Sequence, residues 1–168
     1  VYMSNFQLLP YKRIEEHFAD QFGVPLSAGS IYNFNKEAYE MLAPFESWVK
    51  RELTQALLLH ADETGINIGG KRRWLHVASS ATLTWLMPHN KRGGEAIEAM
   101  EVLPNFSGTL VHDHWKPYYQ LSCQHALCNA HHLRELERAW EQDKQQWAEQ
   151  IQELLLEIND AVNAAGEK

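Results

Sequence analysis

Two acidic residues stand at the ends of apolar stretches that are far apart in the chain. Asp62 ends the run ALLLHAD, and Asp113 ends the run GTLVHD. Carboxylates are rarely buried without a partner or a metal, so an acid at the end of an apolar strand is an unusual placement. Two such acids side by side repel each other and need a cation, and Mg²⁺ or Mn²⁺ fits because these ions prefer oxygen ligands. The pattern is therefore compatible with a divalent-metal site at Asp62 and Asp113, and equally with two solvated acids at strand ends.

A pair of divalent ions at such acids suits phosphoryl transfer, because it activates water and stabilises the leaving oxygen. Glu63 follows Asp62 directly, but successive side chains of a strand point to opposite faces of the sheet. Only one of these two acids can therefore face the predicted site.

A second cluster near the C-terminal half contains His125, Cys128, His131 and His132. The spacing H-x-x-C-x-x-H is compatible with zinc, but zinc sites usually show two paired ligand clusters and only one is present. The alternative is a buried strand cysteine followed by histidines at the start of a helix.

Basic residues in turns and loops are candidates for contacts with nucleic-acid phosphates. Aromatic residues near one of them, Trp115, Tyr118 and Tyr119, could stack on bases or pack the start of a helix. The candidate DNA-contacting residues are Lys71, Arg72, Arg73, Lys91, Arg92, Lys116 and Arg134.

The elements that must position these residues are read from hydrophobic periodicity. Residues 56–68, 72–80 and 81–89 have β character and are separated by turns, the first at Gly69 and Gly70. A short helix before Pro104, a fourth strand within 108–115 and a fifth within 125–130 follow. This order predicts an α/β domain with a mixed sheet: three antiparallel strands, then helix, strand and helix.

The flanking segments read as helices. Ile14, Phe18 and Phe22 recur at helical spacing, the chain breaks at residues 23–25, and Ser27 or Ser30 can cap a second helix. This outline fits a helix-turn-helix or simply two packed helices. After His131, an amphipathic pattern continues to residue 164 and predicts a long C-terminal helix. The predicted domains are 1–52, 53–136 and 137–168.

The bulk composition is that of an ordinary globular domain, with 168 residues, 45% hydrophobic and 22% charged. The net charge of −7 argues against a free-standing nucleic-acid binder. No apolar run approaches the roughly 18 residues of a membrane span, and the N-terminal residues VYMSNFQLLPYKR do not have the pattern of a secretory signal. The two cysteines fit a reducing compartment, so we expect a cytoplasmic protein without a membrane partner.

Three motifs in order, LHADET, GTLVHDHWKPYY and CNAHHLREL, resemble the DDE transposases of the insertion-sequence-66 family. The resemblance implies a ribonuclease H-like fold and divalent-metal-dependent DNA cleavage and strand transfer during transposition. It implies catalytic and metal-binding roles for Asp62 and Asp113, with Mg²⁺ or Mn²⁺ as cofactor. It also implies transposon-end and target DNA as partners, a homo-oligomer, and a bacterial cytoplasmic location at the nucleoid.

The resemblance leaves one acid unassigned. The family's third acid lies in an N-N-x-x-E-R-like segment after a helical insertion, and these 168 residues contain no such segment. We expect that acid beyond Lys168 and the 168-residue chain to be inactive alone; the role is not transferred to Glu135 or Glu137. His114 stands where the family usually has a small residue. The rival hypothesis is a non-catalytic DNA-binding or scaffold module.

Overall fold

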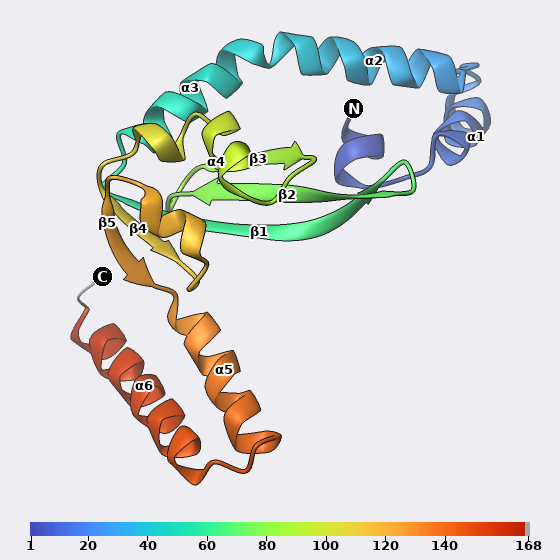
Figure 1. The fold of residues 1–168 in the computed structure, drawn as a ribbon. Helices are drawn as coiled ribbons and strands as arrows, with labels where there is room; N and C mark the ends of the chain where they lie inside the picture. The colour runs from blue at the N-terminus through green and yellow to red at the C-terminus, as the bar shows by residue number, and fades with distance from the viewer. Residues whose placement is uncertain (167–168) are drawn as a thin grey trace. The chain divides into compact units, whose positions relative to one another are not determined.

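The structure is a computed structural model and describes residues 1–166. It divides into two compact units, Val1–Lys50 and Arg51–Lys168, which are considered separately here (Figure 1). The division falls close to the expected boundary after residue 52. The three predicted domain ranges themselves stay predictions.

The first unit is helical, as expected. A short π-helix at Tyr2–Phe6 is followed by α1 (Tyr11–Phe22) and α2 (Ala28–Met41). Gly23 ends α1 with a φ of 64°, a left-handed conformation that glycine adopts without steric cost. The Ser27 hydroxyl accepts a hydrogen bond from the Ser30 amide and caps α2, which confirms the predicted cap. The next helix, α3 (Ala43–Thr54), continues into the second unit.

The second unit is built on one five-stranded sheet. Its strands are β1 (Leu58–Ile68), β2 (Lys71–Ser79), β3 (Thr84–His89), β4 (Thr109–His112) and β5 (Gln124–Leu127), in the order β3-β2-β1-β4-β5. The first three strands are antiparallel neighbours, whereas β4 lies parallel to β1 and β5 parallel to β4. This arrangement confirms the expected ribonuclease H-like mixed sheet.

One face of this sheet carries the core. Along β1, Leu59, Ala61 and Glu63 are buried while their neighbours are exposed. The helical elements that follow β3 and β4, namely α4 (Gly94–Ala99), η2 (Leu103–Asn105) and η3 (Lys116–Gln120), contribute further buried side chains. These include Ala96, Ile97, Met100, Val102, Leu103, Phe106 and Tyr118.

Gly108, just before β4, makes the close approach of β4 to β1 possible. A Cβ atom at this position would lie 2.5 Å from the Leu57 carbonyl oxygen and 2.7 Å from the Phe106 ring. The Thr109 amide donates to that same Leu57 carbonyl at 2.9 Å. Only glycine therefore lets β4 pair with β1 in the observed register.

The C-terminal pattern forms two helices rather than the single long helix that was predicted. α5 (Asn129–Glu141) and α6 (Gln146–Ala165) lie side by side and run in opposite directions (Figure 1). The connection contains no glycine or proline that would reveal a turn in the sequence, and its left-handed position is taken by Lys144, with a φ of 55°. Because both helices continue one apolar periodicity, their apolar faces can pack together across the turn.

Among the described helices, none combines the length and apolar character that crossing a membrane would require.

Candidate active site

Asp62 lies on β1, and Asp113 directly follows β4, the strand that runs parallel to β1 and pairs with it. The pairs Leu58–Thr109, Leu59–Leu110 and His60–Val111 set the register of β1 and β4. Continued for two residues past the last pair, this register would bring Asp113 opposite Asp62. Thus the topology brings together two acids that are far apart in the sequence.

Asp62 faces the more open side of the sheet. Its side chain is exposed, and it lines a cavity of about 170 Å³. Val111 lines the same cavity, and strand alternation then puts Asp113 on that side and His112 on the other. The cavity is completed by His60, Ala61, Val77, Ser79, Cys128 and His131.

Each acid accepts a backbone hydrogen bond through one oxygen. Asp62 Oδ1 accepts from the Glu63 amide at 2.8 Å, and Asp113 Oδ1 accepts from the Trp115 amide at 2.9 Å. Within residues 1–166, neither carboxylate has a cationic side chain as an ion-pair partner. Both acids therefore keep carboxylate oxygen available for a ligand.

Glu63 lies on the opposite face of β1, where its carboxylate is buried and bound by other side chains. Its side chain is 1% exposed. Its Oε1 accepts hydrogen bonds from the Arg92 Nη2 at 2.6 Å and from the Arg92 Nε at 2.8 Å. The Tyr118 hydroxyl donates to its second oxygen at 2.5 Å. The Arg92 guanidinium also lies 4.6 Å from the Trp115 ring and 5.0 Å from the Trp74 ring. Glu63 is thus a fully partnered buried carboxylate.

This network ties the chain segment after Asp113 to β1. Trp115 and Tyr118 follow Asp113 and both contact the network, and their rings are 5.4 Å apart. Burial raises the pKa of Tyr118, and its hydrogen bond to Glu63 and the charges of Glu63, Asp113 and Asp62 raise it further.

Sequence reasoning missed the Glu63 network. Of the two interpretations of Tyr118, base stacking and packing at the start of a helix, the structure agrees with packing, because the residue is 1% exposed and belongs to the core. The exposed Tyr119 is compatible with stacking, and Trp115 is half-buried against Arg92. A buried glutamate beside an exposed aspartate has no signature in a single sequence beyond strand alternation.

The H-x-x-C-x-x-H cluster is not brought together as one site. The His125 Nδ1 meets the His112 Nε2 at 3.0 Å, and the His125 Nε2 donates to the Leu121 carbonyl at 3.2 Å. Burial lowers the pKa of His112, while its hydrogen bond to the Asp113 carbonyl opposes that change. Cys128 and His131 instead line the cavity that contains Asp62.

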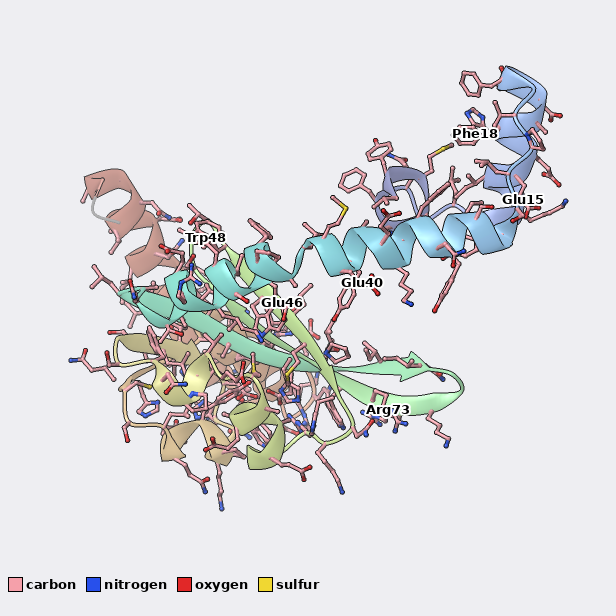
Figure 2. The ribbon with its side chains drawn as sticks, turned by 90° about the horizontal axis from the view of Figure 1, so that it is seen from above. Glu15, Phe18, Glu40, Glu46, Trp48 and Arg73 are labelled. Atoms are coloured by element: carbon pink, nitrogen blue, oxygen red, sulfur yellow. The ribbon has the colours of Figure 1, made fainter. Side chains whose placement is uncertain are left out.

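The candidate DNA-contacting residues are in different situations. Arg72 lies 4.8 Å from the Trp74 ring, Arg92 is held by Glu63, and the Arg134 Nε donates to the Ala130 carbonyl at 3.2 Å. Arg73 is half-buried on the hairpin of β1 and β2 (Figure 2). The other three are exposed and lie in β2 or in loops and short helical turns: Lys71, Lys91 and Lys116.

The family assignment covers the entire sequence. The profile of the transposase IS66 family matches residues 1–168. The chain belongs to the IS66 transposase family. The expected relationship to DDE-type DNA transposases is therefore confirmed.

Solved structures similar to this IS66 transposase include retroviral integrases. The HTLV-2 integrase catalytic core domain in complex with magnesium, in dimeric form, shares 10% identity over 49% of this chain and 70% of that chain, with a TM-score of 0.36. Its trimeric form has the same identity and coverage and a TM-score of 0.35. The simian T-cell lymphotropic virus intasome in complex with PP2A regulatory subunit B56 gamma shares 12% identity over 49% and 40% of the chains, with a TM-score of 0.34. No curated protein gives a significant match.

The acids of this IS66 transposase fit the divalent cation that its family implies. Asp62 and Asp113 supply carboxylate oxygens, the ligand type that Mg²⁺ and Mn²⁺ prefer. No lysine or arginine of residues 1–166 neutralises either acid, so a cation would relieve their repulsion. Two carboxylates are sufficient to hold an ion but do not complete a two-ion site.

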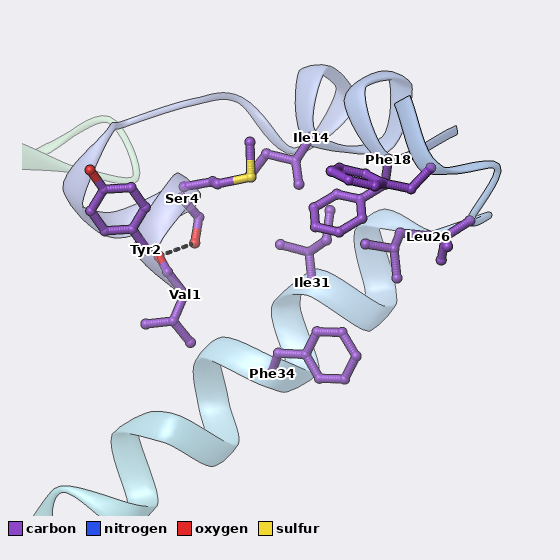
Figure 3. Close-up of a pocket in the computed structure, with 11 residues that line it drawn as sticks. Val1, Tyr2, Ser4, Ile14, Phe18, Leu26, Ile31 and Phe34 are labelled. Carbon is purple, nitrogen blue, oxygen red and sulfur yellow. Dashed lines mark hydrogen bonds between the residues drawn. The ribbon is translucent and has the colours of Figure 1, made fainter. Parts of the chain in front are cut away.

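The helical unit contains a cavity of a different kind. It has a volume of about 630 Å³ and is almost entirely apolar (Figure 3). Apart from the Tyr2 phenol it offers no titratable side chain, so it has no means for acid–base or metal chemistry. Its lining consists of Val1, Tyr2, Met3, Ser4, Ile14, Phe18, Phe22, Val24, Leu26, Ile31 and Phe34.

Proposed function

We propose that Asp62 and Asp113 are two of the carboxylates with which this transposase binds divalent ions to cut and join DNA during transposition of an insertion sequence. The observation that supports the proposal is the parallel pairing of β1 with β4, whose register, continued two residues past His60 and Val111, would bring the two acids opposite each other. The contrast with Glu63 supports it, because only Glu63 is neutralised by an arginine.

The bound Mg²⁺ or Mn²⁺ would supply Lewis-acid activation of water and of the scissile phosphate. The protein's own contribution is to hold the two acids in place. Asp113 is oriented by the Trp115 amide, and Trp115 is in turn packed against Arg92. Glu63 and Arg92 are therefore positioning residues, which act on the site through the segment after β4.

DNA contacts are assigned to the basic residues that the Glu63 network does not engage. Exposed lysines in turns suit phosphate contacts, which set orientation and not sequence preference. We assign this role to Lys71, Arg72, Arg73, Lys91, Lys116 and Arg134. Arg92, a candidate from the sequence, has a more direct role in holding Glu63.

The remaining carboxylate is proposed to come from an N-N-x-x-E-R-like segment outside these 168 residues. The partners that follow are transposon-end and target DNA and further copies of the transposase, in the bacterial cytoplasm at the nucleoid. Glu135 and Glu137 on α5 are the alternative source within this chain.

The test is a strand-cleavage and strand-joining assay with Mg²⁺ or Mn²⁺, in a version of the protein that includes the N-N-x-x-E-R-like segment. Asp62→Ala and Asp113→Ala should each abolish both reactions while DNA binding persists, because phosphate contacts lie elsewhere. Glu98→Ala, an exposed acid on α4, is the matched control and should remain active.

Two outcomes would contradict the proposal. Full activity in either aspartate variant would remove that acid from the site. DNA binding without cleavage in every version would favour a scaffold module. Cleavage by the 168-residue chain alone would instead place the third acid within it, with Glu135 and Glu137 as the first candidates.

A further inference from the structure

Three potential metal-binding side chains meet just beyond the proposed catalytic acids. His114 comes from the segment after β4, while His132 and Glu135 come from α5. The His114 Nε2 and the His132 Nδ1 are 3.4 Å apart, and the Glu135 Oε2 is 3.7 Å and 3.8 Å from these nitrogens. No other group of three such residues lies this close together in the described part of the chain.

These separations match those of ligands around one metal ion. Zinc bonds of about 2.0–2.1 Å in tetrahedral geometry separate ligand atoms by roughly 3.3–3.4 Å. The observed triangle therefore needs to contract by only a few tenths of an ångström. His132 and Glu135 are three residues apart, so they share one face of α5. The side chains of His114 and Glu135 are 49% and 62% exposed, which leaves them free to adjust.

The types of ligand select the ion. Two imidazoles with one carboxylate suit zinc and the neighbouring late transition metals, whereas Mg²⁺ prefers oxygen ligands alone. The alternative is a surface cluster held by the hydrogen bond between the two imidazoles, and metal binding distinguishes the two arrangements. A carboxylate equally close to both ring nitrogens is the arrangement that an ion between them would produce.

We propose that His114, His132 and Glu135 form a binding site for Zn²⁺ or a similar late transition-metal ion. Three protein ligands leave a further position for water. The ion would link the segment that carries Asp113 to the first turns of α5. The site is independent of the proposed catalytic role of Asp62 and Asp113, because it uses different residues and a different class of metal.

The sequence did not predict this site, although His114, His132 and Glu135 all lie within the motifs that carry the family resemblance. His114 stands where a small residue is usual, and the zinc spacing that the sequence suggested involves His125, Cys128 and His131 instead. Only the position of α5 beside the end of β4 brings His114 to His132.

The test is metal binding by the purified 168-residue chain, freed of metal and without Mg²⁺. Titration calorimetry should show one Zn²⁺ per chain, with a rise in Tm. Co²⁺ should give the visible absorption of a nitrogen- and oxygen-bound ion, and Zn²⁺ should displace it. His114→Ala, His132→Ala and Glu135→Gln should each weaken Zn²⁺ binding by at least about tenfold, since each removes one of three ligands.

The controls are chosen for matched chemistry. His17→Ala removes an exposed histidine of α1, and Glu137→Gln removes a glutamate on another face of α5; both should bind Zn²⁺ normally. Asp62→Asn should also keep Zn²⁺ binding. Circular dichroism checks that every variant is folded, and the Co²⁺ spectrum of the unaltered chain tests the site without any variant.

Three results would overturn the proposal. The first is the absence of saturable binding of one Zn²⁺ or Co²⁺ per chain. The second is loss of binding in Cys128→Ser but not in His114→Ala, which would assign the ion to the H-x-x-C-x-x-H spacing. The third is joint loss of Mn²⁺ binding in Glu135→Gln and Asp62→Asn, which would place Glu135 among the catalytic carboxylates.

Discussion

Two neighbouring acids of β1 lie on opposite faces of the sheet and have opposite surroundings. Asp62 is exposed beside a small cavity and has no cationic partner in the described residues, whereas Glu63 is 1% exposed and bound by Arg92 and Tyr118. The same functional group is therefore available to a ligand on one face and fully neutralised on the other. The difference shows that the surroundings of a carboxylate, and not its presence in a motif, decide whether it can hold an ion.

The buried face also explains how the open face is kept in order. A buried charge is costly unless it is paired, so Glu63 constrains Arg92 and Tyr118 closely. His76 adds to this by donating to the Lys91 carbonyl at 3.2 Å, which holds the loop that carries Arg92. Through Trp115, the constraint reaches the residue whose amide bonds Asp113. The buried Glu63 network thus helps to hold Asp113 in position on the other face of the sheet.

The largest effect is expected when the positively charged partner of Glu63, the Arg92 guanidinium, is removed. Arg92→Met should lower the free energy of unfolding by about 3 kcal/mol or more, because it leaves Glu63 buried and unpaired. Urea unfolding followed by circular dichroism measures the loss. Arg134→Met, at an exposed arginine of α5, is the control and should change stability little. A loss below about 1 kcal/mol would mean that Glu63 becomes hydrated or protonated without strain.

A smaller effect is expected when the neutral partner of Glu63 is removed. Tyr118→Phe should lower the free energy of unfolding by about 2 kcal/mol, since it deletes one hydrogen bond to a charged group. Tyr11→Phe, at a phenol that accepts a hydrogen bond from Asn35 in the helical unit, is the matched control and should cost less.

The same variant has a signature in its pH dependence. The pKa of Tyr118 is raised in the folded state, so the unfolded chain loses this proton first as the pH rises above 10.0. The stabilisation is complete below pH 10.0 and is lost progressively above it. Above pH 10.0, the free energy of unfolding should therefore fall more steeply with pH for the unaltered chain than for Tyr118→Phe. Parallel slopes would show that Tyr118 titrates normally.

The smallest effect is expected on the open face. Mn²⁺ or Mg²⁺ should stabilise the chain by about 1.4 kcal/mol at a concentration ten times its Kd, because only the folded state brings the two acids together. Differential scanning calorimetry should record a rise in Tm that Asp62→Asn or Asp113→Asn abolishes. Glu98→Gln, an exposed acid on α4, should keep the full response. An unchanged response in both aspartate variants would place the ion elsewhere.

The sequence by itself determined the elements and the two acids. Hydrophobic alternation predicted the strands, Ser27 predicted the start of α2, and the apolar runs before Asp62 and Asp113 identified both residues. These features are local, because a strand's alternation and a helix cap depend on residues close in the chain. The family resemblance rests on the same local motifs, and the match over residues 1–168 confirms it.

Only the tertiary structure decided which side chains meet. The turn at Lys144 has no glycine to reveal it, so the division into α5 and α6 follows from packing of one apolar face on another. The Glu63–Arg92 pair spans 29 residues, and the contact of His114 with His132 spans 18. Such contacts depend on strand order and helix placement, which local periodicity does not encode. The pairing of β1 with β4, where Gly108 allows the strands to come close, likewise decides how near the ends of the two apolar runs that precede Asp62 and Asp113 lie to each other.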